Sequence, residues 1–165
     1  MNISDTIIFD FTKVSNISSW KVVDDVVMGG ESIGNFSLND KGNGVFYGEV
    51  SLENNGGFSS LSYNFDKIEI KQFSKIILRV KGDGKKYQFR IKDKKKNYYS
   101  YVKDFFTDTS WQNIEINLSE MYPTFRGRKL EMDNFSSNFI EEVRILIGNK
   151  RNEKFKLEID KIYLQ

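Results

Sequence analysis

Three short segments of this 165-residue sequence hold side chains that could bind a ligand or do chemistry. The first segment joins neighbouring carboxylates to a glycine pair: Asp24, Asp25, Met28, Gly29, Gly30 and Ser32. A binding loop or a cation site is one interpretation. The favoured interpretation is a turn between two strands with an exposed acidic pair, because calcium needs about six to eight oxygen ligands and only two are apparent here.

The second segment is rich in Asn and Gly: Glu53, Asn54, Asn55, Gly56, Gly57 and Phe58. We expect a hairpin turn, because Asn and Gly tolerate the left-handed backbone conformations that tight turns need. A ligand loop is the alternative. Amide and carboxyl groups bind sugar hydroxyls, and an aromatic ring covers the apolar face of a sugar.

The third segment, residues 121–129, is basic and aromatic and includes Arg126, Gly127 and Arg128. A guanidinium group suits a carboxylate, a phosphate or the acidic side chain of a partner. An equally favoured interpretation is a long connection in which the arginines hold their own loop in place.

The composition excludes the common catalytic groups. The chain has no His and no Cys, so Ser–His and Cys–His catalysis and sites built on those ligands are excluded. Carboxylate pairs for glycoside hydrolysis are available in Glu49, Glu53 and Glu115, but nothing in the sequence brings two of them to the required separation. The sequence therefore predicts a non-enzymatic protein with no cofactor and no metal.

Charge and hydropathy patterning say little about partners. The formal net charge is +2, too balanced to predict nucleic-acid binding. No apolar stretch approaches the roughly 18–20 residues of a membrane-spanning helix, so no membrane insertion is expected. The start of the chain carries Asp5 and Asp10 without a basic leader, which does not resemble a signal peptide. A cytoplasmic location is therefore expected.

Alternating apolar and polar residues recur at short spacing, which is typical of an antiparallel all-β domain. Strands are predicted over 6–11, 20–23, 32–38, 44–52, 58–65, 75–81, 86–92, 98–103, 111–117, 142–148 and 155–164. Helical turns are expected at 118–122 and 134–141, and Gly82-Asp83-Gly84 is expected to form a hairpin turn. The favoured architecture is one domain over 1–165, a two-sheet β-sandwich of jelly-roll type; a closed barrel is the alternative.

Period-two assignment also predicts a polar sheet face that could bind a ligand. If the central strands are neighbours, one face shares these side chains: Arg79, Gln88, Arg90, Tyr99, Tyr101 and Glu115. Aromatic platforms with hydrogen-bonding neighbours suit sugars.

Several blocks together resemble a known family. They are DDVVMGGES over 24–32, GVFYGEVSLENNGGFSS over 44–60, GDG over 82–84, and FRGR over 125–128 after Pro123. Their order and length resemble the complex I intermediate-associated protein 30 family over nearly the whole chain. The resemblance implies a galactose-binding-like β-sandwich related in shape to carbohydrate-binding modules. It also implies assembly-chaperone relatives of respiratory NADH:ubiquinone oxidoreductase that act through protein contacts and not as enzymes.

Two functions follow as hypotheses, with carboxylate-based catalysis the least favoured third. The first is a non-catalytic module that binds a partner protein such as an assembly intermediate. The alternative is a module that binds carbohydrate or another small ligand. Hydrogen bonds among Asp24, Asn54, Asn55 and Arg126, or from them to nearby backbone, would make the shared blocks fold determinants, which is the favoured outcome. An open pocket lined by them would favour a ligand.

Overall fold

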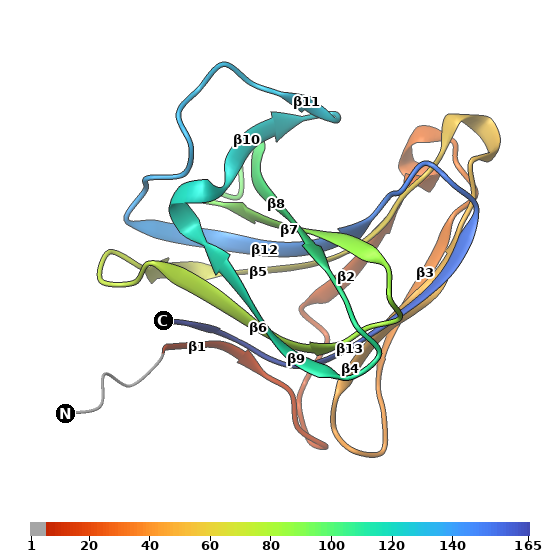
Figure 1. The fold of residues 1–165 in the computed structure, drawn as a ribbon, viewed down its shortest axis with the longest axis horizontal. Coiled ribbons are helices and arrows are strands. Elements are labelled where there is room, and N and C mark those ends of the chain that lie inside the picture. Colours follow the sequence, from red (N-terminus) through yellow and green to blue (C-terminus); the bar gives the residue numbers. More distant parts are fainter. Residues whose placement is uncertain (1–5) are drawn as a thin grey trace.

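The computed structural model describes residues 6–165, which form an antiparallel sandwich of two β-sheets (Figure 1). The strands are β1 (Thr6–Asp10), β2 (Trp20–Asp24), β3 (Ile33–Leu38), β4 (Gly44–Val50), β5 (Ser59–Glu69), β6 (Lys75–Lys81), β7 (Lys86–Lys92), β8 (Ser100–Phe106), β9 (Trp111–Asn117), β10 (Tyr122–Phe125), β11 (Arg128–Lys129), β12 (Phe139–Ile147) and β13 (Glu153–Leu164). Three single turns of 3-10 helix join them: η1 (Asp25–Met28), η2 (Glu53–Asn55) and η3 (Leu118–Glu120). Within the described residues no helix has the length and apolar character needed to cross a membrane.

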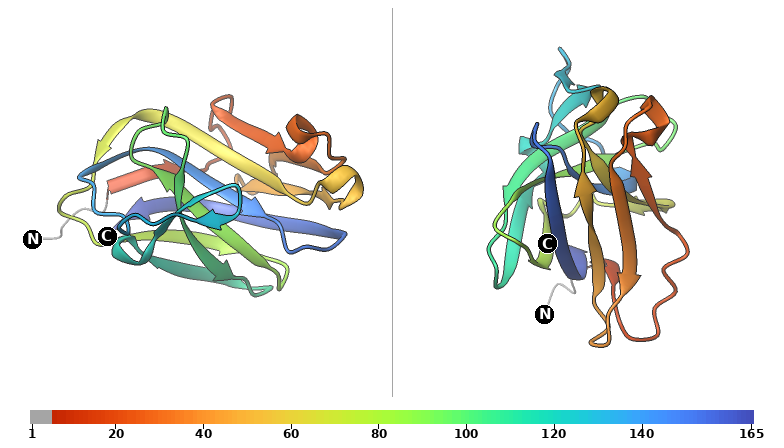
Figure 2. Two further views of the ribbon diagram at one scale, coloured as in Figure 1. Left: turned by 90° about the horizontal axis from the view of Figure 1, so that it is seen from above. Right: turned by 90° about the vertical axis from the view of Figure 1, so that its right-hand side faces the viewer.

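The six-stranded sheet has the order β3-β4-β13-β6-β9, with β1 also pairing with β13. The seven-stranded sheet has the order β11-β10-β8-β7-β12-β5-β2. The two sheets lie face to face, as two further views show (Figure 2). The all-β sandwich predicted from alternation is therefore confirmed, and the barrel alternative is wrong because the strands form two separate sheets.

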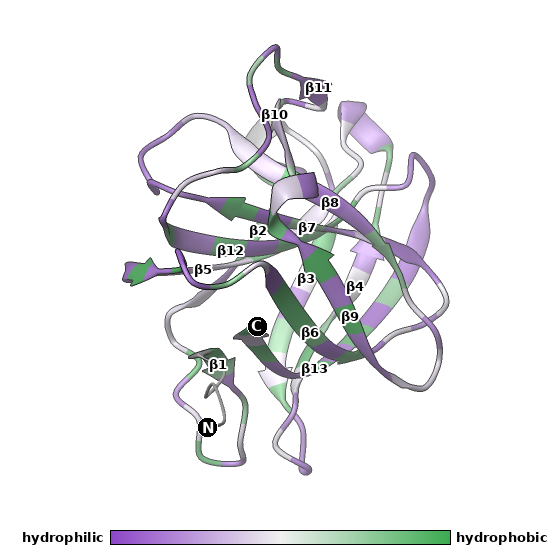
Figure 3. Ribbon diagram, turned by 60° about the vertical axis from the view of Figure 1, so that its left-hand side comes forward, coloured by the Kyte–Doolittle hydropathy of each residue, from purple (hydrophilic) through white to green (hydrophobic). Residues whose placement is uncertain are grey.

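The core fills the space between the sheets with residues from alternate strand positions. In β7, Tyr87, Phe89 and Ile91 are buried while the residues between them are half-buried on the opposite face. Hydrophobic and hydrophilic residues alternate visibly along β9 (Figure 3). This period of two follows from the pleat of a β-strand, which points successive side chains to opposite faces.

Several details of the sequence prediction are wrong. Residues 134–141 form no helix, because β12 begins at Phe139 and pairs there with β5. The short strands β10 and β11 were not predicted. Gly82-Asp83-Gly84 is not a hairpin turn, since β6 and β7 lie in different sheets and the segment crosses between them. The helical turn at 118–122 is confirmed in shorter form as η3.

Candidate binding site

The Asp25 carboxylate joins the two glycine-rich loops at one end of the sandwich. Only 1% of this residue is exposed. The Ser32 backbone and hydroxyl donate to it at 2.9 and 2.6 Å, and the Gly57 and Phe58 amides donate at 2.6 and 3.2 Å. A carboxylate can accept this many bonds because it has two oxygens with about four lone-pair directions. Asp25 therefore holds the 24–32 and 53–58 loops together.

The same contacts decide the ionisation of Asp25. Burial by itself raises the pKa of this carboxyl, but the hydrogen bonds from the Ser32 hydroxyl and from the amides of Gly57, Ser32 and Phe58 outweigh it. The net result is a lowered pKa, because each donor favours the charged form. The predicted exposed acidic pair is therefore wrong for Asp25.

Asp24 is also a fold determinant. One of its carboxylate oxygens accepts from the Gly34 amide at 2.9 Å, and the other accepts from the Ser59 hydroxyl. These bonds connect β2 with the start of β3 and β5, which lie in different sheets. Of the four residues expected to bond one another or nearby backbone, Asp24 therefore does so through the Gly34 amide.

The glycines beside Asp25 leave room for its carboxylate. A Cβ atom built on Gly30 would lie 2.4 Å from the Asp25 carboxyl carbon, and one on Gly56 would lie 2.5 Å from an Asp25 oxygen. Both distances are too short for any residue with a side chain. Much of the Asp24–Ser32 and Glu53–Phe58 pattern is thus explained by packing around one buried acid. The side chain of Met28 lies outside the described residues.

The Asn pair in this turn shapes the backbone. Asn54 and Asn55 have positive φ angles of 55° and 61°, which Asn tolerates. The expected hairpin turn is wrong, because β4 and β5 lie in different sheets and the segment crosses between them. The Asn54 amide reaches the exposed Glu31 carboxylate only at 3.4 Å, and Asn55 lines a shallow hollow of about 280 Å³ beside Gly57. Neither amide is held in the way that the Asp25 carboxylate is.

A groove of about 480 Å³, which shares Gly57, Phe58 and Gly148 with that hollow, crosses the outer face of the seven-stranded sheet. It is lined by Gly57, Phe58, Gln88, Arg90, Lys92, Tyr98, Ser100, Arg126, Gly127, Arg144, Leu146 and Gly148. The floor comes from β7 and β12, and the walls come from the β10–β11 turn on one side and the segment before β5 on the other. Figure 1 shows the β10–β11 turn standing above this sheet.

Two arginines face each other in the floor of this groove. Arg90 in β7 and Arg144 in β12 are register partners in the antiparallel ladder, so their side chains leave the same face side by side. Arg90 donates to the Gln88 carboxamide oxygen at 2.9 Å, and Arg144 donates to the Ser60 hydroxyl at 3.3 Å. Burial, followed by repulsion from Arg144, lowers the pKa of Arg90.

Glu142 is the nearest described acid to this pair. It is buried, and its carboxylate lies 3.7 Å from the Arg144 guanidinium. Lys92 is its register partner in β7 and donates to the Asn97 carbonyl at 2.7 Å. Burial lowers the pKa of Lys92, and the nearby Arg144 and Arg90 lower it further while Glu142 opposes the change. Positive charge therefore exceeds negative charge in the groove.

The third predicted segment forms the wall of the groove. Arg126 and Gly127 have φ angles of 49° and 78° and make the two-residue turn between β10 and β11. The Arg126 guanidinium lies 5.2 Å from the centre of the Phe125 ring, and that ring packs edge-on against the exposed Tyr98 at 5.1 Å. Arg128 is exposed in β11 and does not line the groove.

The predicted six-residue sheet face is wrong as a single surface. Gln88 and Arg90 lie in the groove, but Arg79 and Glu115 lie in β6 and β9 of the other sheet. Arg79 pairs there with Asn113 across the ladder. Local alternation gives the face of each strand but not the sheet to which the strand belongs.

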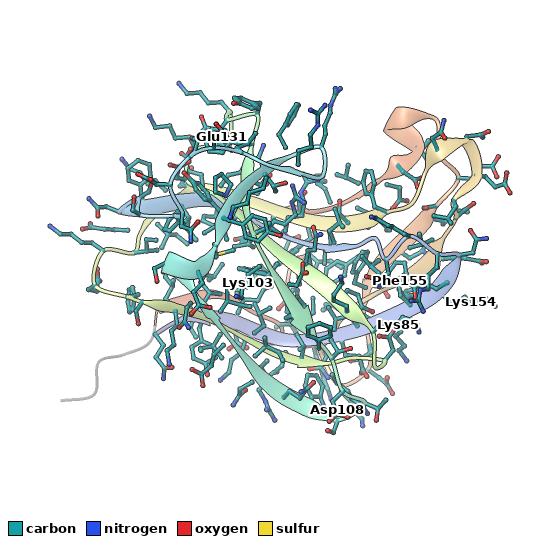
Figure 4. The ribbon with its side chains drawn as sticks, turned by 45° about the horizontal axis from the view of Figure 1, so that its top comes forward. Lys85, Lys103, Asp108, Glu131, Lys154 and Phe155 are labelled. Atoms are coloured by element: carbon teal, nitrogen blue, oxygen red, sulfur yellow. The ribbon has the colours of Figure 1, made fainter. Side chains whose placement is uncertain are left out.

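The two tyrosines of that prediction face the other way. Tyr101 is buried and packs edge-on against the core residue Phe135 at 5.1 Å, and burial raises the pKa of its hydroxyl to about 12. Tyr99 is half-buried and packs against Tyr101 at 5.7 Å. Lys103, labelled in Figure 4, belongs to the same strand, β8. Its ammonium lies 3.1 Å from the Glu120 carboxylate.

Comparison with known proteins shows the family of this chain. A sequence model of the complex I intermediate-associated protein 30 (CIA30) family matches residues 9–159. The chain belongs to this family. An uncharacterized protein of Schizosaccharomyces pombe is 34% identical over 131 residues, and this CIA30 member covers 60% of that relative's length.

Solved structures similar to this CIA30 member include carbohydrate-binding modules. A family 11 module from Clostridium thermocellum, in complex with a β-1,3-1,4-mixed-linked tetrasaccharide, has a TM-score of 0.73 at 17% identity, with 99% of this chain and 96% of that chain covered. A family 61 module in complex with β-1,4-galactotriose has a TM-score of 0.51 at 12% identity, covering 98% and 97% of the two chains. An exo-β-agarase matches over 97% of this chain and 25% of its own, with a TM-score of 0.62 at 11% identity. At these low identities the TM-scores show a shared fold alone. The galactose-binding-like sandwich that the family resemblance implies is confirmed.

Sequence reasoning missed six groove residues of this CIA30 member: Lys92, Tyr98, Ser100, Arg144, Leu146 and Gly148. Alternation along 142–148 puts Arg144 on the face opposite Val143 and Ile145, so the direction of its side chain could have been predicted. Its closeness to Arg90 could not, because the pairing of β7 with β12 joins segments about fifty residues apart. Among residues 6–165 no group of three or more metal-ligating side chains comes together.

Proposed function

We propose that this protein is a non-catalytic binding module and that the groove across the seven-stranded sheet is its ligand site. The observation that supports the proposal is the composition of the groove: hydrogen-bonding side chains of β7 and β12 form the floor, and Tyr98, which is 63% exposed, stands at the rim beside Phe125. This combination suits an extended saccharide, since polar groups bind hydroxyls and an aromatic ring covers the apolar face of a sugar. The fold shared with carbohydrate-binding modules supports the same assignment.

The test is calorimetric titration of the intact chain with a panel of soluble oligosaccharides, first as wild type and then as Tyr98→Ala. Tyr98 is exposed, so its truncation leaves the fold intact, and we expect about tenfold weaker binding of any saccharide that the wild type binds. Tyr47→Ala is the matched control, because Tyr47 is an exposed tyrosine on β4 of the other sheet. No binding by any saccharide, or equal losses in both variants, would overturn the proposal.

A partner protein is the second candidate. The family description points to complex assembly, and three exposed apolar residues, Val26, Ile33 and Leu52, lie on the segments that Asp25 and Ser32 join. A photo-cross-linking residue at position 33 would then give a discrete protein adduct in the native host, whereas one at exposed Asn113 would not. Identical adduct patterns at both positions would remove this candidate.

A further inference from the structure

Four cationic side chains line the groove, and no acidic side chain does. They are Arg90, Lys92, Arg126 and Arg144. Glu142 lies on the same face of β12 as Arg144, is buried beside the groove and is 3.7 Å from the Arg144 guanidinium, so it offsets one positive charge and leaves the others. A neutral saccharide needs hydrogen bonds from its site but no such excess of charge. The surplus therefore demands an explanation beyond the binding of hydroxyl groups.

The Arg90–Arg144 pair is costly to the free protein. Two like charges directly opposite each other in a ladder destabilise a sheet. Burial and the neighbouring guanidinium both disfavour the charged form of Arg90. Binding an anion between the two guanidinium groups would remove this repulsion, and each planar guanidinium could form paired hydrogen bonds to an oxyanion.

The backbone of Arg126, at the rim of the same groove, adopts a second unfavourable arrangement, a strained conformation. Its φ of 49° lies in the left-handed region, where a non-glycine residue other than Asn or Asp is disfavoured. The two-residue turn that it shares with Gly127 favours Asn at this position. An arginine in that place puts a guanidinium at the rim of the groove, and local strain of this kind is concentrated at functional sites.

We propose that the groove binds an anionic saccharide, one bearing carboxylate or sulfate groups. Arg90 and Arg144 bind one oxyanion in the floor, and Arg126 contacts a second oxyanion at the rim. This inference rests on the proposed function and narrows its ligand class. The charges of Lys92 and Arg126 extend the site beyond a single anion, so a chain with regularly spaced acidic groups fits better than a monosaccharide.

The experiment titrates the intact protein with three probes of similar length: an oligogalacturonide, the neutral β-1,4-galacto-oligosaccharide, and poly-glutamate. We expect the oligogalacturonide to bind at least about tenfold more tightly than the neutral probe, with affinity falling as salt rises, because exposed charges are screened over about 10 Å at 0.1 M salt. Sulfated galacto-oligosaccharide in a fourth titration distinguishes sulfate from carboxylate.

Two groove variants and one matched control complete the test. Arg90→Gln and Arg126→Asn should each weaken oligogalacturonide binding by about tenfold or more, since each removes a charge-assisted contact. Arg79→Gln removes an arginine from the outer face of the other sheet and should leave binding unchanged. Both groove variants keep a polar side chain, and circular dichroism checks their fold.

The outcomes separate the inference from the proposed function. Equal binding of neutral and acidic probes, with loss in Tyr98→Ala, would overturn the anionic preference and leave the saccharide site standing. Tight binding of poly-glutamate alone would overturn the saccharide site and show that the cations serve an acidic protein segment. Equal effects of Arg79→Gln and Arg90→Gln would overturn the placement of the anion in the groove.

Discussion

At the scale of the residue, Asp25 is the carboxylate on which two loops depend. Asp25→Asn replaces an oxygen acceptor by an NH₂ group that faces backbone and hydroxyl donors, so buried donors of Gly57 or Ser32 lose their partner. We expect the free energy of unfolding to fall by about 3 kcal/mol, because hydrogen bonds to a charged acceptor contribute about 1.5–3 kcal/mol each and a buried donor left alone costs more. Urea denaturation measures this. Glu31→Gln, an exposed change nearby, should alter the same quantity by less than about 0.5 kcal/mol, and an equal effect of the two variants would contradict the assigned role.

The pH dependence of stability gives an independent check on Asp25. Its pKa in the folded protein is lowered, so its contribution is fully present above the unfolded pKa of about 3.9 and is lost as the pH falls through the folded value. The difference in unfolding free energy between wild type and Asp25→Asn should therefore be largest near about pH 7 and shrink below about pH 4. Urea denaturation at a series of pH values measures the difference. A gap that widens with acid would show that the carboxylate is not held in its charged form.

Arg126 offers the opposite experiment, a substitution expected to stabilise. Asn accepts the left-handed conformation at position 126 more readily than Arg does. We expect Arg126→Asn to raise the free energy of unfolding by about 0.5–1 kcal/mol, measured as a higher midpoint in urea. Arg128→Asn serves as control, because residue 128 lies in β11, outside the turn itself. A loss of stability in Arg126→Asn would show that the guanidinium stabilises the fold and would weaken the case for a ligand contact.

At the scale of the element, the β3–β4 pair depends on a close approach of two strands. A Cβ atom on Gly48 would lie 1.9 Å from the Ile33 carbonyl oxygen, which belongs to the backbone of the paired strand and cannot move aside without breaking the ladder. Gly48→Ala should therefore lower the free energy of unfolding by at least about 2 kcal/mol. Ser37→Ala, an exposed change in the same strand pair, should have little effect. Similar thermal midpoints for both variants would show that the strands can separate locally.

The strands themselves were predictable from the sequence, while their partners were not. Alternation in 75–81 and 86–92 follows from the pleat and gives the bounds of β6 and β7. The GDG segment between them looks like a hairpin turn, yet its strands belong to different sheets, because long-range pairing with β13 and β12 decides their places. The side chain of Tyr101 was wrongly predicted to lie on the outer face. An amphipathic tyrosine fits either face of a strand, and packing against Phe135 selects the inner face.

The candidate site was likewise only partly predictable from the sequence. The glycine-rich blocks were visible as motifs, but their explanation lies in the buried Asp25 carboxylate, which contacts residues 7 and 33 positions away in the sequence. Arg126 was identified from its own segment. The groove that it borders needed the register of β7 with β12, which no local pattern carries.

At the scale of the whole molecule, the last two strands of the chain each pair with strands from earlier parts of the sequence. β13 pairs with β1, β4 and β6, and β12 pairs with β5 and β7, so strands from the C-terminal quarter lie inside both sheets. One core of buried residues receives side chains from both sheets. A local opening of either sheet would therefore expose the shared core, and this topology favours cooperative unfolding.

Scanning calorimetry tests that cooperativity directly. We expect a single transition whose calorimetric and van't Hoff enthalpies agree, with a total of about 115 kcal/mol near about 60 °C, because globular chains absorb about 0.7 kcal/mol per residue on unfolding there. The oligogalacturonide should raise the midpoint of that one transition, since a ligand that binds only the native state stabilises everything that unfolds with it. The Arg79→Gln variant should show the same rise, and Arg90→Gln a smaller one. Two resolved transitions, with the ligand moving only one of them, would show instead that the sheets unfold separately and that the groove belongs to an independent unit of the sandwich.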